Sequence, residues 1–198
     1  MIAQRCLRLL RRMACGLLLL ALTGAAGAQP AQDKARETLV KAAFLHKFAS
    51  FVDWPQGAFA RPDTPLKIGI LGNDTVWQDL TELAKDRDRD GRPVIPARVN
   101  PGEPLAGYHI LYLKAVPARM AELLAQVPEG VLTVTDSDSG HPRGSVISFF
   151  IEDGRVRFGV SLDSATRQRL RLSSRLLQVA SNVQGALPAR PVLAQVAD

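Results

Sequence analysis

Cysteine is almost absent from this 198-residue chain, which contains only Cys6 and Cys15. Both lie in a segment with the features of a secretion signal: an arginine-rich start, a short apolar core over Gly16–Leu22 and an A-x-A cleavage sequence that ends at Ala28. The apolar core is too short to span a membrane. We therefore expect residues 1–28 to be a cleaved signal peptide. The mature chain would then be periplasmic, without disulfides, thiol nucleophiles or thiolate metal sites.

Positive charge is also less abundant than the whole-chain composition suggests. The chain has 25 Lys and Arg against 19 Asp and Glu, a net charge of +6. Four of the arginines and none of the acidic residues belong to the signal, so the mature chain has 21 basic against 19 acidic residues, a net charge of +2. No basic stretch with interleaved aromatic residues remains. This composition argues against nucleic-acid binding.

Familiar catalytic motifs are missing. The sequence has neither the G-x-S-x-G elbow of serine hydrolases nor the H-E-x-x-H motif of zinc proteases. Its three histidines are far apart: His109 is expected inside an apolar strand, His46 on a solvated helix face and His141 in a loop. Ser173 is interpreted as a helix cap, not a nucleophile. We expect no enzyme activity and no cofactor. A hydrolase assembled from distant residues such as His109 and Asp136 is the least favoured alternative.

No metal site is expected either. Asp86, Asp88 and Asp90, followed by Gly91, resemble the start of a calcium-binding loop. The twelfth position of such a loop needs a bidentate glutamate, but here it is Ala97. Arginines also alternate with the three acids. We interpret the segment as a solvated charged loop.

The sharpest structural prediction concerns a β-hairpin around Asp153-Gly154. This dipeptide suits a two-residue turn with positive φ at both positions. Such a turn places six apolar side chains on one face of the hairpin, so turn chemistry and apolar pattern require the same register. The predicted cross-strand pairs are Ile147 with Val160, Phe149 with Phe158, Ile151 with Val156 and Glu152 with Arg155.

The order of apolar segments predicts an α/β fold: a single domain over residues 29–184, with a mixed sheet of about six strands, helices on its faces and a C-terminal β-hairpin plus two helices. Residues 29–34 are expected to be a polar leader and residues 185–198 a flexible tail. The expected helices are Ala35–Phe51, Asp74 or Thr75 to Lys85, Val116–Gln126, Ser164–Leu170 capped by Asp163, and one capped by Ser173 or Ser174 whose apolar side extends to Val183. The expected strands before the hairpin are Leu66–Leu71, Arg92–Val99 at an edge because of Pro96, Tyr108–Leu113 and Val131–Thr135.

Aromatic and cationic residues exceed what folding requires, and they are our candidate functional residues. Trp54 is either a lid on the core or an exposed anchor for a partner. Lys41 lies in the apolar arc of the first helix, where either its stem packs and its ammonium reaches solvent, or the cation lines a pocket. Arg171 is either solvated or reaches a carboxylate or phosphate. The candidate partner-binding residues are Phe51, Trp54, Phe59 and Arg61, and the candidate ligand-pocket residues are Lys41, Arg171, Ser173, Asn73 and Asp74.

Several short motifs, in this order and spacing, resemble the YfiR family over about residues 34–183. No single motif is specific, and the resemblance rests on their succession. They are Lys41-Ala42-Ala43-Phe44-Leu45, Phe48, Phe51-Val52, Trp54-Pro55, Ile70-Leu71-Gly72, Gly91-Arg92-Pro93-Val94, Leu132-Thr133-Val134, Phe149, Glu152-Asp153-Gly154, Val156, Phe158, Leu170-Arg171-Leu172-Ser173-Ser174 and Leu176-Leu177.

The resemblance implies a small periplasmic protein, often a homodimer, that binds the periplasmic sensor region of an inner-membrane signalling enzyme. In the best-known system it inhibits a diguanylate cyclase, which lowers cyclic-di-GMP and so regulates biofilm formation. An outer-membrane lipoprotein relieves that inhibition by sequestering the inhibitor, and other members serve sensor kinases. This chain departs from the family in one respect. Well-known members carry disulfides linked to redox control, and the mature chain expected here has no cysteine.

Two functional hypotheses follow. The first is a regulatory binding protein that represses the periplasmic sensor region of a diguanylate cyclase. The alternative is a module that binds an anionic or aromatic small molecule at the loops after the strands, and that works with a sensor kinase or another membrane partner.

Overall fold

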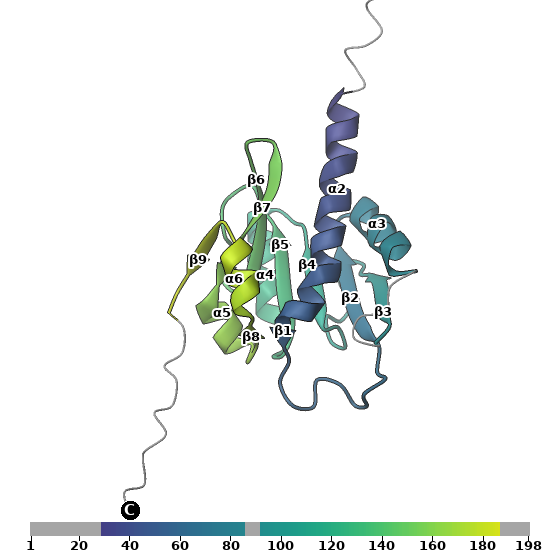
Figure 1. Cartoon of the computed structure of the whole chain (residues 1–198), viewed down its shortest axis with the longest axis vertical. Coiled ribbons are helices and arrows are strands. Elements are labelled where there is room, and N and C mark those ends of the chain that lie inside the picture. Colours follow the sequence, from purple (N-terminus) through teal and green to yellow (C-terminus); the bar gives the residue numbers. More distant parts are fainter. Residues whose placement is uncertain (1–28, 86–91, 187–198) are drawn as a thin grey trace, which may run out of the picture. The chain divides into compact units, whose positions relative to one another are not determined.

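The computed structural model describes residues 29–85 and 92–186 of the chain (Figure 1). The chain divides into two compact units, residues 1–37 and 38–198. The described part of the first unit is the start of helix α2, and the account below concerns the second. The predicted signal peptide, the calcium-like segment 86–91 and the predicted tail beyond residue 186 lie outside the described residues.

A seven-stranded mixed sheet organises the second unit, which confirms the predicted α/β class with one strand more than expected. Its order is β3-β2-β4-β5-β6-β7-β9. The first five strands in this order, from β3 to β6 and including β2, are parallel to one another. Strand β7 is antiparallel to β6, and β9 runs parallel to β7. The strands are β2 Leu66–Leu71, β3 Val94–Arg98, β4 Ile110–Leu113, β5 Leu132–Asp136, β6 Ile147–Glu152, β7 Arg155–Ser161 and β9 Asn182–Gln184.

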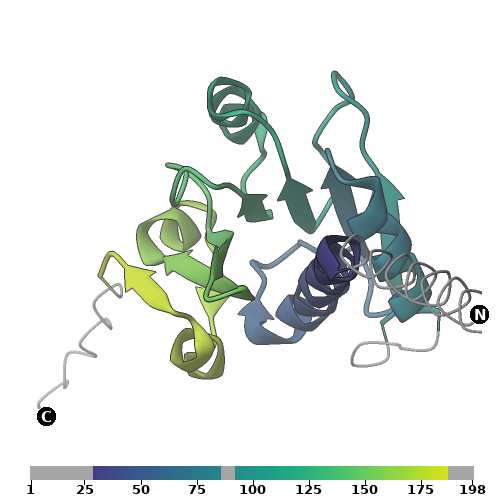
Figure 2. The same cartoon turned by 90° about the horizontal axis from the view of Figure 1, so that it is seen from above.

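Helices cover both faces of this sheet because its central strands are apolar on both sides, as in other parallel sheets. Figure 2 shows α4 on one face and α2 on the other. Alternate residues of each strand point to opposite faces. In β4, Ile110 and Tyr112 join the core that includes α2 and α3, while Leu111 and Leu113 join the core under α4. The helices are α2 Gln29–Phe48, α3 Asp74–Ala84, α4 Pro117–Gln126, α5 Leu162–Arg167 and α6 Ser174–Val179.

The first helix is longer at its start, and tighter at its end, than the sequence predicted. The helix α2 begins at Gln29, so the expected polar leader is helical, and a 3-10 turn, η1 Ala49–Phe51, replaces its predicted last turn. The prediction that His46 faces solvent is wrong, because its side chain is buried. Beyond η1, the strand β1 (Val52–Asp53) pairs antiparallel with β8 (Arg171–Leu172) in a separate two-stranded sheet.

The hairpin prediction is confirmed in every pair. β6 and β7 join Ile147 to Val160 and Phe149 to Phe158, with the register predicted from the turn. Asp153 has a φ of 49° and Gly154 a φ of 69°, the positive values that a tight turn of this kind needs. The hairpin buries Phe149 and Phe158 against Phe44 and Phe48 of α2, with ring centroids 5.2–6.0 Å apart.

Two predicted helix caps need correction. The cap of α3 is Asn73, whose side chain accepts a hydrogen bond from the Val76 amide, in place of Asp74 or Thr75. The cap of α5 is Ser161 and not Asp163, because the last residue of β7 already presents its hydroxyl to the Ser164 amide. Helix α6 does have the predicted cap, Ser173.

The predicted apolar side of that last helix does not continue to Val183. Helix α6 ends at Val179, and residues 182–184 form β9 beside β7. Pairing with β7 satisfies backbone groups of the hairpin strand that would otherwise be a sheet edge. The Asn182 side chain lies where Gly159 of β7 has no Cβ, so the close approach of the two strands depends on that glycine.

Within the described ranges, no helix has the length and apolar character needed to cross a membrane.

Candidate functional site

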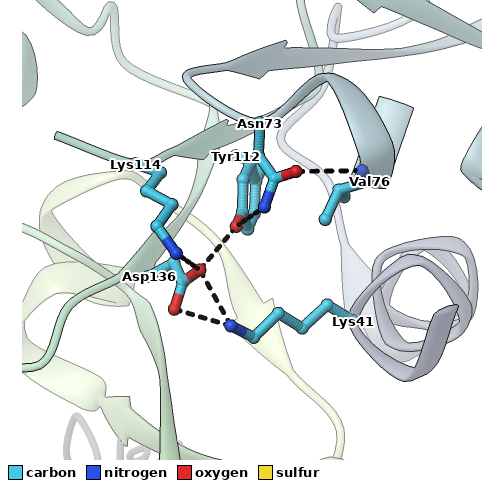
Figure 3. A network of polar contacts seen from close by, with 6 residues as sticks. All are labelled: Lys41, Asn73, Val76, Tyr112, Lys114 and Asp136. Atoms are coloured by element: carbon cyan, nitrogen blue, oxygen red, sulfur yellow. Dashed lines mark hydrogen bonds and ion pairs between the residues drawn. The ribbon is translucent and has the colours of Figure 1, made fainter. Parts of the chain in front are cut away.

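A buried carboxylate, Asp136, gathers polar side chains at the carboxyl end of β5 (Figure 3). Both of its oxygens accept hydrogen bonds from the Lys41 ammonium at 2.8 Å. The Tyr112 hydroxyl donates to Oδ2 at 2.7 Å, and the Lys114 ammonium donates to the same oxygen at 3.0 Å. The Asn73 side-chain amide lies 3.5 Å from the Tyr112 hydroxyl, at the outer limit of a hydrogen bond. Residues of α2, of β4 and its following turn, and of the turn after β2 therefore converge on one acid.

Lys41 has neither of the two roles considered from the sequence. Its side chain is about 2% exposed, so the ammonium does not reach solvent, and it points at Asp136 in place of an open pocket. Burying a lone ammonium is very costly, and a paired carboxylate with hydrogen bonds to its remaining lone pairs offsets that cost. The pair ties α2 to the end of β5.

Opposing effects set the pKa of Asp136. Burial raises the pKa of this carboxyl, because the charged form loses water. Hydrogen bonds from Lys41, Tyr112 and Lys114, together with the Lys41 charge, lower it. The lowering effects prevail, and the pKa lies below the ordinary value for Asp. The carboxylate therefore stays ionised at neutral pH.

Next to this network is the point where the strand order reverses. The chain goes from β2 outward to β3 and then returns across β2 to β4, so the crevice between the ends of β2 and β4 is the topological switch point. Gly72 makes the close approach there: it has a φ of 84°, and a Cβ at this position would overlap the Lys114 carbonyl oxygen.

A cavity of about 540 Å³ occupies this switch point. Two of the candidate pocket residues, Asn73 and Asp74, line it, together with Arg98, Lys114 and Arg119. Arg98 is held in place, since it pairs with Asp74 at 3.0 Å and lies 4.5 Å above the Trp77 ring. The other candidate pocket residues are elsewhere. Lys41 belongs to the network behind the cavity, and Arg171 and Ser173 are not among its lining residues.

Arg171 and Ser173 lie instead beside the predicted partner-binding segment. Arg171 pairs with Asp53 in the β1–β8 ladder, and the Ser173 amide donates to the Phe51 carbonyl at 2.9 Å. Phe51 itself is partly buried against the main core. Arg61 is exposed and forms an ion pair with Asp63 at 3.3 Å.

A second cluster, aromatic rather than ionic, lies at the opposite end of the sheet. Phe59 stacks on His109 with ring centroids 4.3 Å apart and an interplanar angle of 9°. The Arg92 guanidinium lies 3.9 Å from the centroid of the same ring. Trp54 contacts both Phe59 and His109 edge-on, at 6.1 and 6.0 Å. We call these four residues, Trp54, Phe59, Arg92 and His109, the aromatic cluster.

His109 organises this cluster as a neutral ring, as the prediction of a satisfied interior histidine required. Its Nδ1 accepts a hydrogen bond from the Lys67 amide at 3.1 Å, so the proton is on Nε2, which donates to the Ala58 carbonyl at 3.1 Å. Burial lowers the pKa of His109, and the charges of Arg92 and Lys67 lower it further, against the effect of the Ala58 carbonyl, which raises it.

An open groove of about 600 Å³ runs beside the aromatic cluster, at the amino ends of β2, β4 and β5. Segments far apart in sequence form its walls: residues 55–58, 106–109 and 128–131, together with Lys67 and Arg169. Trp54 and Phe59 are only partly buried against the core, and the groove begins one residue after Trp54. Of the aromatic cluster, His109 lines this groove itself.

Sequence reasoning missed several residues that the structure assembles. Asp136 was expected in the loop after its strand and was considered only for the unfavoured hydrolase, while Tyr112, Lys114, Arg92 and Arg119 received no functional role. One signal was available: Asp136 and Lys114 directly follow apolar strands whose carboxyl ends meet at one edge. No group of three or more His, Cys, Asp and Glu able to hold a metal ion occurs in the part of the chain that the structure describes.

A family model described as YfiR/HmsC-like matches residues 38–181, well over half of the chain. A search of the curated proteins finds no match.

Proposed function

The chain belongs to the YfiR/HmsC-like family, and we propose that it is a periplasmic regulatory binding protein. It occupies the periplasmic sensor region of an inner-membrane diguanylate cyclase and lowers the output of cyclic-di-GMP. The family match supports this proposal. The aromatic cluster beside the amino-end groove is the observation that indicates which residues would contact the sensor region.

The aromatic cluster has the composition of an interface anchor. Tryptophan and arginine are the residues most enriched among those that dominate binding energy at protein interfaces. Here Trp54 is partly buried and already positioned by Phe59 and His109, so docking would cost little side-chain entropy. Arg92 is held over Phe59 and donates to the Thr64 carbonyl at 2.6 Å. The cluster therefore offers a rigid, preformed contact surface.

The proposed effect comes from docking alone. A protein that occupies a sensor domain shifts the balance of its two signalling states by the difference in its affinity for them. No bond has to be made or broken for this role. The homodimer, the sequestering outer-membrane lipoprotein and the sensor kinase as an alternative partner are parts of the same proposal, and the resemblance described above is their support.

The test is co-purification of the mature chain with the isolated periplasmic domains of the membrane cyclases and sensor kinases of its own organism. We expect one cyclase domain to bind, and a deletion strain to contain more cyclic-di-GMP. Binding only to a sensor-kinase domain would favour the alternative partner. Binding to neither class, with unchanged cyclic-di-GMP in the deletion strain, would remove the proposal.

The contribution of the aromatic cluster is tested with Trp54→Ala. We expect the affinity for the bound domain to fall at least about tenfold, or about 1.4 kcal/mol, while the variant stays folded. Val179→Ala is the matched control, since Val179 is a 64% exposed apolar residue on α6. It should bind like the wild type. Unchanged binding by Trp54→Ala would place the interface elsewhere.

A further inference from the structure

The switch-point cavity has charge that the fold does not require. Asp136 is bound at both oxygens by Lys41 and receives the Tyr112 hydroxyl, and these two contacts satisfy it within the protein. Lys114 is a second ammonium on the same carboxylate, and its side chain is 45% exposed at the cavity. Two ammonium groups against one carboxylate leave one positive charge at the cavity wall.

A second cation stands at the same cavity. Arg119, 43% exposed, pairs only with Glu122 of its own helix at 2.7 Å among the contacts of the described residues. An exposed i,i+3 pair of this kind is a weak interaction, so a ligand can replace it at little cost. Arg98, in contrast, is neutralised by Asp74. The cavity therefore presents Lys114 and Arg119 to whatever enters it.

The backbone around the cavity favours the same sign of ligand. Ala115 and Arg119, on either side of the start of α4, both line the cavity. The N-cap of that helix, Val116, makes no side-chain capping bond in the described structure, so the positive end of the helix dipole is not capped by a side chain. The start of α3 is different, because Asn73 already caps it.

We propose that this cavity binds a small organic phosphate, with Lys114 and Arg119 as the ligands of the phosphate group. A dianionic phosphate suits two cations better than a single carboxylate does, and arginine presents a planar fork to phosphate oxygens. The volume of about 540 Å³ is in the range of small-molecule sites. The location at the carboxyl ends of the strands is the usual one in open α/β sheets. This site is separate from the proposed docking surface and does not depend on it.

The test is isothermal titration calorimetry of the mature chain, without any partner, against inorganic phosphate, pyrophosphate and citrate at constant ionic strength. We expect saturable one-site binding of the two phosphate probes, tighter for pyrophosphate. The double variant Lys114→Gln/Arg119→Gln should weaken pyrophosphate binding at least tenfold. It should fold normally, as thermal unfolding would confirm, because Lys41 and Tyr112 still hold Asp136.

The matched control is Arg155→Gln/Arg157→Gln, which removes two cations from the hairpin and should bind pyrophosphate like the wild type. Equal weakening in both double variants would reduce the binding to net charge and overturn the site. Binding of citrate as tight as that of pyrophosphate would overturn the assignment to phosphate. Absence of saturable phosphate and pyrophosphate binding would overturn the proposal altogether.

Discussion

The two ends of the central sheet are built from different interactions. At the carboxyl end, a buried lysine, tyrosine and aspartate are joined by hydrogen bonds of 2.7–2.8 Å, and water is largely excluded from them. At the amino end, the Phe59 and His109 rings stack beside an open groove, and Trp54 and Phe59 are only partly buried against the core. The first arrangement ties backbone segments together, and the second leaves aromatic side chains partly exposed at the surface that we propose for docking.

Helix α2 connects the two ends. Lys41 belongs to the ionic network at the carboxyl end. The end of η1 lies about 15 Å further along the helix axis, at 1.5 Å per residue, and Trp54 follows it in the chain. Between them, Phe44 and Phe48 pack on the hairpin strands. The ion pair therefore anchors the element that positions the aromatic cluster. The comparison predicts that damage at the carboxyl end is mainly lost stability, and damage at the amino end mainly lost binding.

The largest effect is expected from Asp136→Ala. This variant leaves the Lys41 ammonium buried without its carboxylate, which should lower the free energy of unfolding by about 3–5 kcal/mol. Chemical denaturation followed by circular dichroism measures it, with exposed Asp138→Ala as the control. The double variant Lys41→Met/Asp136→Leu should recover much of the loss, since no charge remains buried. A loss below about 1 kcal/mol for Asp136→Ala would mean that the pair is not the anchor of α2.

Substituting one glycine with positive φ at each end compares how tightly the two ends are packed. A Cβ at Gly72 meets the Lys114 carbonyl oxygen, whereas a Cβ at Gly57, in the groove wall, meets no atom of the described residues within 4 Å. Gly57→Ala should cost only the left-handed backbone term of about 1 kcal/mol. Gly72→Ala should cost about 3 kcal/mol or more, because the new Cβ also forces β2 and β4 apart. Equal losses in thermal unfolding would show that the switch point is not tightly packed.

Acid should loosen the amino end before the carboxyl end. The folded pKa of His109 lies below its usual value of 6.5, so the unfolded chain binds the proton more readily. The stability due to the neutral ring is then complete above pH of about 6.5 and is lost as the pH falls toward the folded pKa. The pKa of Asp136 is also lowered, from 3.8, so its contribution is lost only at still lower pH.

The check is denaturant unfolding between pH 7.5 and 5. We expect the wild type to lose stability as the pH falls over this range, because the pKa of His109 in the folded protein lies below its usual value of 6.5. His109→Gln should show a flatter profile, while His141→Gln, in the loop after β5, should follow the wild type. A wild-type slope that His109→Gln leaves intact would assign the acid sensitivity to another group.

The smallest effect is expected from Arg92→Met. It removes the guanidinium from the face of Phe59 and the hydrogen bond to the Thr64 carbonyl, but keeps an apolar stem. The loss of stability should be about 1 kcal/mol, as for an exposed cation–π contact. Thermal unfolding beside Arg155→Met measures it. A loss as large as that of Asp136→Ala would end the distinction between the two ends.

Local chemistry allowed much of this fold to be predicted. A turn and an alternating apolar pattern are both local, so the hairpin register followed from Asp153-Gly154 and the apolar positions on either side of it. The edge position of β3 followed from Pro96 for the same reason. The ionic network could not be predicted this way, because Lys41 and Asp136 are 95 residues apart and meet only through packing of α2 on the sheet. The buried position of His46 was missed because one helix can be covered on more than one side.

The aromatic cluster was predicted in part, unlike the hairpin register, which was predicted in full, and the ionic network, which was missed. Trp54 and Phe59 were recognised as unusual from composition, but the pairing with Arg92 and His109 needed the return of the chain from β3 to β4. Residues 171 and 173 were placed in a pocket by chemistry alone. Their true position beside Phe51 depends on the β1–β8 pairing, which two-residue strands do not reveal in a sequence.

The most direct test of this account compares two variants for binding to the cyclase periplasmic domain identified by co-purification. Trp54→Ala/Phe59→Ala changes the amino end, and Lys114→Gln/Arg119→Gln changes the carboxyl end. Calorimetry should show at least about a tenfold loss of affinity for the first and less than about a twofold change for the second. The opposite ranking, or equal losses in both, would contradict the assignment of docking to the aromatic cluster.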